Sequence, residues 1–238
     1  MSHMPVAPPP PPSPSSPGWA VPAGPSAVLR SPVGLSQAVM LLLGLVAVAD
    51  VFALWQGARS YELAGRIIAN VGSVTSGEID RADALYRVSG YVQVAFTLAT
   101  AVVFLVWFHR TRVNAEVFAP ECHAKKRAWT IWGWIVPVIN LWFPRRIAAD
   151  IWNASADGNS RSRALLNWWW ALWIVDLLFG RLASRRYVAA ETPEEIKGAI
   201  AGLMASDGFN IAAAVLAVLF VRRLTRMQHE KALRGPAV

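Results

Sequence analysis

The sequence lacks most of what a soluble enzyme needs. Only 16% of its 238 residues are charged, 55% are hydrophobic, and the mean hydropathy is +0.36. A single cysteine, Cys122, excludes an internal disulfide, and its neighbour His123 brings no second pair of metal ligands. A glycine-rich phosphate loop and the GxSxG, HExxH and CxxC motifs are also missing. We therefore expect no enzymatic activity, no cofactor and no metal site.

What the chain has instead is long apolar runs. Residues 35–56 and 88–108 are each about long enough to cross a bilayer as one helix, and residues 164–180 and 209–221 are shorter apolar segments. So little polar surface cannot keep these runs in water. The sequence predicts an all-α, polytopic membrane helix bundle in the cell membrane.

The domain organisation follows from composition. Residues 1–30 are expected to form a disordered, proline-rich cytoplasmic tail, since ten of the sixteen prolines fall between Pro5 and Pro25. This start lacks a basic segment followed by an apolar core, so we expect no cleaved signal peptide. Residues 31–228 are predicted to form one membrane helical domain, and residues 229–238 a short polar C-terminal tail.

Two helix starts can be located from local patterns. Thr75 is followed three residues later by Glu78, as in a capping box, and a helix beginning there would run on into the second span. Thr192 precedes Pro193 and two glutamates, which predicts an N-cap with proline and acids in the first turn. We expect that helix to continue toward the C-terminus, with Asp207 and Gly208 as the place where it could break.

The apolar stretch 129–143 is ambiguous. Fifteen residues of helix rise about 22 Å against an apolar bilayer core of about 30 Å. Pro137 removes a helical hydrogen bond, and Asn140 adds polarity. Four crossings plus a re-entrant or interfacial segment is the favoured arrangement, and five crossings is the alternative.

The positions of the basic residues favour four crossings. If residues 129–143 enter and leave on the same side, the two sides of the membrane carry 15 and 8 of the 23 Lys and Arg residues, whereas five crossings would give 10 and 13. The side richer in Lys and Arg is the cytoplasmic one. Both termini are therefore predicted to be cytoplasmic.

Three segments resemble a known family: VWFHRTRVNAEVFAP, GWIVPVINLWFPRRIAADIW and AAAVLAVLFVRRLTRMQ. They are similar to the actinobacterial membrane proteins grouped as domain-of-unknown-function family 4328. The similarity covers about residues 31–228, and the GWxxPxxNLWxP block at 133–144 is its most specific part. The resemblance implies a multi-helix membrane domain without an assigned activity, and it supplies no catalytic residues.

Two acids inside apolar runs form a candidate intramembrane polar site. An ionised Asp at the centre of a membrane helix costs about 2.5–3.5 kcal/mol, so Asp50 and Asp176 each need a partner or water. Arg59 and Arg181 are candidate counter-charges, which would make the acids structural. Asn140 is added to the site as a polar group beside a proline turn, although it could equally serve the backbone groups freed by Pro137.

A second candidate surface combines basic and aromatic residues. Tryptophan favours the headgroup region of a bilayer, and Lys and Arg attract anionic lipids. The residues that could contact anionic headgroups are Lys125, Lys126, Arg127, Trp129, Trp132, Trp142, Arg145, Arg146 and Trp152. Simple anchoring of the tryptophans is the plainer interpretation.

These features leave two function classes. One is a non-catalytic scaffold or regulatory partner that contacts the lipid bilayer, anionic lipids included, and an unidentified protein. The other is a small transporter or channel that uses Asp50 and Asp176. The basic residues cluster where apolar runs end, which favours membrane topology over binding of nucleic acid. The sequence indicates neither a substrate nor an oligomeric state.

Overall fold

The computed structural model describes residues 28–156 and 162–234, and over these residues the chain is all-α. The helices are α1 (Val33–Ala69), α2 (Ser76–Phe118), α3 (Trp129–Ile135), α4 (Phe143–Ser155), α5 (Ala164–Ala189) and α6 (Pro193–Arg234). Short 3-10 turns occur at Val71–Ser73, Pro120–Cys122 and Ile139–Leu141. The predicted tail is described only from residue 28 onward.

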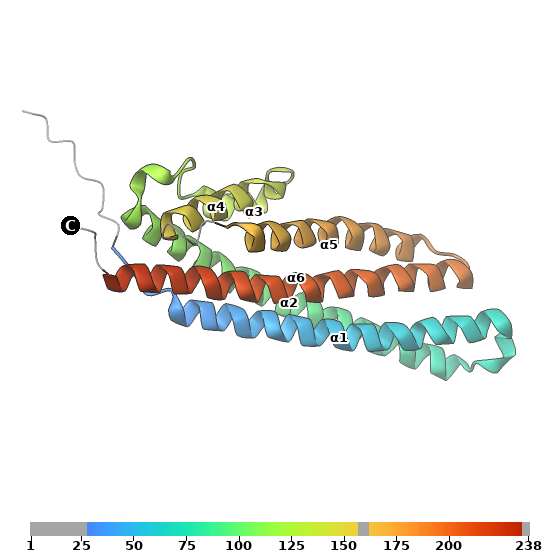
Figure 1. The fold of residues 1–238 in the computed structure, drawn as a ribbon. Helices are drawn as coiled ribbons and strands as arrows, with labels where there is room; N and C mark the ends of the chain where they lie inside the picture. Colours follow the sequence, from blue (N-terminus) through green and yellow to red (C-terminus); the bar gives the residue numbers. More distant parts are fainter. Residues whose placement is uncertain (1–27, 157–161, 235–238) are drawn as a thin grey trace, which may run out of the picture.

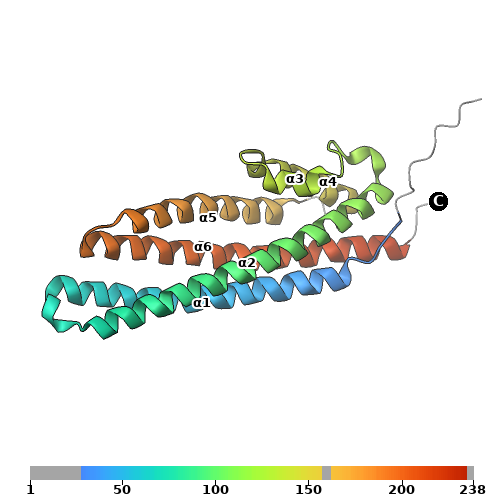
Figure 2. The same cartoon turned by 180° about the vertical axis from the view of Figure 1, so that it is seen from behind.

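Four long helices lie side by side (Figures 1 and 2). Three of them, α1, α2 and α6, are long and apolar enough to cross a membrane, with 37, 43 and 42 residues. At 1.5 Å per residue each exceeds the apolar core of a bilayer, which is about 30 Å thick. The expectation of a multi-pass helical membrane protein is confirmed at this level. Helix α6 packs along α1 and α5, and α1 also packs along α2.

The helix starts lie where local chemistry predicts them. Thr75 and Glu78 form a complete capping box at the start of α2. The backbone N–H of Glu195 donates to the side chain of Thr192, and α6 begins at Pro193. Helix α6 is continuous through Asp207 and ends at Arg234, so residues 229–234 extend the helix instead of belonging to a separate tail.

The stretch 129–143 does not form the straight helix that a fifth crossing needs. Helix α3 has seven residues, about 10 Å of rise, and ends before Pro137, where the missing N–H interrupts the helical ladder. Helix α4 begins at Phe143 and lies against α3, and both stay near the end of the bundle that holds the C-terminus of α6 (Figure 1). The turn between them points along the bundle toward its middle.

The turn between α3 and α4 contains a strained residue. Val138 has φ 67° and ψ −51°, and the N–H of Ile139 donates to the carbonyl of Pro137 at 2.8 Å. This is a γ-turn of the rare, strained hand. A β-branched residue rarely adopts positive φ, so this turn is held by its surroundings and not by local preference.

Four tryptophans of the central region are buried inside the protein. Trp107 and Trp152 have no exposed surface, and Trp169 and Trp170 are each only 6% exposed. They form one aromatic core with Phe220, which stacks on Trp152 and Trp169. The expectation that these rings mainly anchor the protein at the headgroups is wrong for this group, because burying their large apolar surfaces against each other holds α2, α4, α5 and α6 together.

Candidate functional site

Asp50 and Asp176 lie in the same polar cluster. Nε2 of Gln93, on α2, donates to Oδ1 of Asp50 at 2.8 Å and to Oδ1 of Asp207, on α6, at 3.0 Å. On α5, Asp176 accepts a hydrogen bond of 2.8 Å from the hydroxyl of Ser206. Asp176 is close enough to both other acids for their charges to interact. Four helices therefore bring three carboxyl groups together.

Sequence analysis missed two members of this cluster, Gln93 and Asp207. Asp207 was considered only as a break in the last helix, and Gln93 looked like an isolated polar residue within an apolar run. The signal that was available is that every long helix carries one amide or acid at its apolar segment. Only the packing of the four helices shows that these residues meet.

Within the part of the chain that the structure describes, the acids of the cluster form no ion pair. Among residues 28–156 and 162–234, the ion pairs join Arg66 to Glu78, Arg226 to Glu230, and Glu116 to both Arg112 and Arg127. Of the two counter-charges that the sequence suggests, the guanidinium of Arg59 lies over the ring of Trp55.

Asp50 is fully buried and only partly satisfied. It has no exposed surface, and its Oδ2 makes no hydrogen bond of ordinary geometry to any described residue. The side chain of Asn210 approaches this carboxyl group. A buried carboxyl oxygen without a partner is costly, because nothing replaces the water that it loses. The cluster therefore offers acceptor capacity to a proton donor or a cation.

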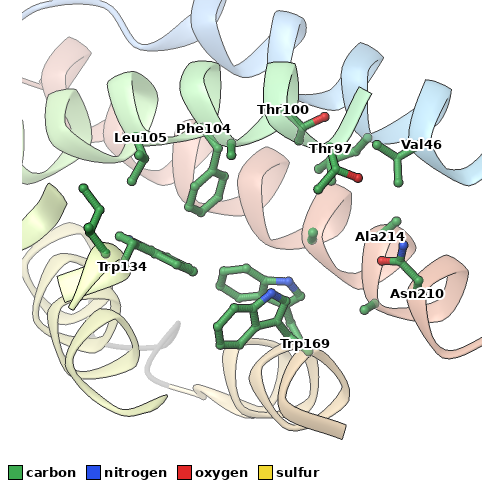
Figure 3. A pocket seen from close by; sticks show the side chains of 15 residues that line it. Val46, Thr97, Thr100, Phe104, Leu105, Trp134, Trp169, Asn210 and Ala214 are labelled. Carbon is green, nitrogen blue, oxygen red and sulfur yellow. The ribbon is translucent and has the colours of Figure 1, made fainter. Parts of the chain in front are cut away.

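A groove of about 380 Å³ lies beside this cluster, and its wall is mostly apolar. Residues from five helices line it, as Figure 3 shows. At one end Phe104, Trp134 and Trp169 point toward one another, and at the other end lie Val46 and Asn210. Helix α6 forms its floor, and α2 and α5 flank it. The groove is partly open.

The polar end of the groove is one helical turn from the acids. On α1, Asp50 follows the lining residue Val46 by four positions, and on α2 Gln93 precedes the lining residue Thr97 by four. Residues three or four apart lie on the same face of a helix. A spacing of three positions separates Trp173 from Asp176 and Asp207 from Asn210. On each of the four helices, about one helical turn separates a residue that lines the groove from a residue of the acidic cluster or its extension, Gln93.

An aromatic pair lies on the opposite side of the acids from the groove. The rings of Tyr86 on α2 and Tyr187 on α5 are 5.7 Å apart. Tyr86 is close enough to Asp207 for an electrostatic interaction. Both tyrosines lie toward the end of the bundle where α1 joins α2 and α5 joins α6 (Figure 1).

Asn140 does not join the acids. It lies in the turn between α3 and α4, where its backbone N–H donates to the carbonyl of Val136. This places it within the proline-bounded turn, away from the residues of α1, α2, α5 and α6 that form the acidic cluster.

Some of the candidate lipid-contact residues are exposed, and the others contact other residues of the protein. Lys126, Arg146, Trp132 and Trp142 are exposed at the α3–α4 end of the bundle. Arg127 pairs with Glu116, Arg145 donates to Asn167, Lys125 lies over Phe143, and Trp129 packs against Phe143. Trp152 is fully buried beneath Arg223, so it cannot reach a headgroup in this arrangement.

The chain belongs to a protein family that is defined by a domain of unknown function. Residues 71–226 match the model of the domain of unknown function DUF4328. The matched region includes Gln93, Asp176 and Asp207, whereas α1, which carries Asp50, lies before it. The match says nothing about the source organism. No curated protein and no solved structure matched the chain.

Proposed function

We propose that this protein crosses the membrane four times, with α5 as the fourth span and both termini in the cytoplasm. Helix α5 has 26 residues, about 39 Å, and packs along α6. The ends that meet beside α3 and α4 carry most of the Lys and Arg residues. That distribution matches the rule that places basic loops in the cytoplasm.

Within this topology the protein acts without catalysis, as a regulatory membrane protein that binds a small organic cation at the acidic cluster. The observation that carries the proposal is that Asp50, Asp176 and Asp207 share one site without a paired basic side chain. Charges inside a membrane are costly, and ionisable residues there are commonly functional. A cation entering the cluster would replace the missing counter-charge.

Binding of tetramethylammonium and hexyltrimethylammonium to the full chain in nanodiscs tests the proposal, with protein-free nanodiscs subtracted. We expect saturable binding that falls at least tenfold in the Asp50→Asn, Asp207→Asn double variant. The matched control is Asp80→Asn, the same substitution at an exposed position of α2. If the double variant and the control bound the cations equally, Asp50 and Asp207 would not be part of the cation-binding site.

Transport is the second candidate, and the tyrosine pair is the observation that favours it. Tyr86 and Tyr187 stand between the acids and one end of the bundle, where they could separate the site from water. If the protein is a carrier, Tyr86→Ala should speed cation release from loaded proteoliposomes while binding persists. If it is a receptor, cation efflux from vesicles that contain the variant should equal efflux from vesicles without protein.

Contact with anionic lipid accompanies either function. Lys126 and Arg146 are exposed near Trp132 and Trp142, so basic groups and indole rings are available at the α3–α4 end. In nanodiscs of mixed lipid, enrichment of phosphatidylglycerol around the protein should fall in the Lys126→Gln, Arg146→Gln double variant. If the double variant kept the same enrichment of phosphatidylglycerol, the lipid contact would have to involve other residues.

A further inference from the structure

The groove between α2 and α5 lies one helical turn from the acidic cluster, and this juxtaposition deepens the proposed function, on which the following inference rests. Three of the groove's lining side chains are indoles, those of Trp134, Trp169 and Trp173. The remainder is mostly aliphatic, and Asn210 supplies polarity where the acids begin. A ligand that filled both regions would have an apolar body and a cationic end.

The re-entrant hairpin shapes the groove. Trp134 on α3 contacts Phe104 on α2 at 5.4 Å and Trp173 on α5 at 5.6 Å between ring centroids. It therefore fills the space between α2 and α5 on the α3–α4 side. The groove is partly open between these two helices, whose other faces expose Val102 and Leu178.

We propose that the groove is the binding site for the hydrophobic part of a lipophilic cation, which enters from the bilayer and places its charged group against Asp50 and Asp207. Charge complementarity selects this occupant over a neutral lipid chain, because three carboxyl groups that form no ion pair with any described residue lie one turn from the groove. The indole faces add attraction, since cations bind favourably over tryptophan rings.

The size of the groove fits this class of ligand. Its volume of about 380 Å³ lies at the lower end of small-molecule pockets, which span about 300–1,000 Å³. A chain of six carbons with a trimethylammonium head is small enough to fit a groove of this volume. Asp50, with no exposed surface and an unpartnered Oδ2, is the group that gains most from the head.

Filling the groove provides the test. Ala101 lines the groove on α2, whereas Ala99, two residues earlier, is exposed on the same helix outside it. We expect Ala101→Trp to weaken hexyltrimethylammonium binding at least tenfold and to leave tetramethylammonium binding within about twofold. Ala99→Trp, which adds the same ring outside the groove, should change neither.

A second measurement on the wild-type chain does not depend on the folding of a variant. Because 6-bromohexyltrimethylammonium carries a heavy atom at its apolar end, it should quench the tryptophan fluorescence of the wild-type chain saturably. If quenching instead rises linearly with the concentration of 6-bromohexyltrimethylammonium in the bilayer, without saturation, the groove assignment is overturned.

The outcomes separate the two proposals. If Ala101→Trp behaves like Ala99→Trp while the double Asp variant still loses binding, the acids bind a cation but the groove does not hold its apolar part. If the wild-type chain binds neither ammonium ion, the cation-binding function fails, and this inference fails with it.

Discussion

Asp50 and Asp207 accept hydrogen bonds from the same nitrogen atom, Nε2 of Gln93, at 2.8 and 3.0 Å. These residues come from three helices that are far apart in the sequence, and the amide of Gln93 is the group that joins two carboxyl groups of like charge. The stability of the bundle therefore depends on the side chain of Gln93, which no local sequence pattern distinguishes.

Gln93→Leu should therefore destabilise the bundle. The variant leaves two carboxyl groups without their shared donor, and each unsatisfied buried polar group costs about 1–3 kcal/mol. We expect the free energy of unfolding in mixed micelles to fall by about 2 kcal/mol or more. The control is Val94→Leu, at a position that is 58% exposed. Equal stability of the two variants would show that the amide does not hold the acids together.

Val138→Gly should stabilise the α3–α4 turn. Val138 has φ 67°, where an L-residue with a β-branched side chain is disfavoured and glycine is not. Relief of this strain should raise the free energy of unfolding by about 1 kcal/mol, after the greater freedom of glycine in the unfolded chain is subtracted. Thermal unfolding in detergent measures the effect. A loss of stability would mean that the valine side chain contributes more by packing than its backbone costs.

Cys122 reports the topology directly, since it is a free, exposed cysteine in the turn after α2. With both termini in the cytoplasm, a membrane-impermeant maleimide should label it only after the cells are permeabilised. In a Cys122→Ser background, Val71→Cys should be labelled in intact cells, because Val71 is 75% exposed at the opposite end of the bundle. The reverse pattern would invert the proposed orientation.

His123 should make stability depend on pH. Burial lowers the pKa of His123 below its usual 6.5, and the positive charge of Arg112 acts in the same direction against the opposing charges of Glu116 and Asp150. The unfolded chain therefore binds a proton more readily than the folded one. Stability contributed by neutral His123 is present above pH 6.5 and is lost as the pH falls from 6.5 through the lowered pKa of the folded state.

The His123→Gln variant should remove this component of the pH dependence. Unfolding free energies measured between pH 5 and pH 8 would show a shallower slope for the variant than for the wild type. His229→Gln is the matched control, because His229 is exposed on α6. If both variants follow the wild-type slope, the acid sensitivity belongs to other groups.

Local patterns in the sequence predict the starts of two long helices. Thr75 with Glu78, and Thr192 with Pro193, locate the starts of α2 and α6, because capping satisfies backbone groups within a few residues. Proline at 137 accounts for the end of α3 for the same local reason.

Longer-range features could not be predicted in this way. Ala95 and Ala99 on α2 have the same four-residue spacing as Ala49 and Ala53 on α1, yet the pair on α2 is exposed and the pair on α1 is buried. The tryptophans suggested headgroup anchoring, whereas Trp107 and Trp152 are buried in an aromatic core. In each case the composition of one helix does not reveal which other helix, if any, packs against a given face of it.

By itself, the sequence determined that this is a helical membrane protein of the DUF4328 family, since apolar run length and capping act through neighbouring residues. Only the tertiary structure decided that Asp50, Asp176 and Asp207 share one site, and that a groove lined by Trp134 lies one helical turn from it. The physical reason is that a contact between two helices depends on the direction each face points after packing, and no single helix contains that information.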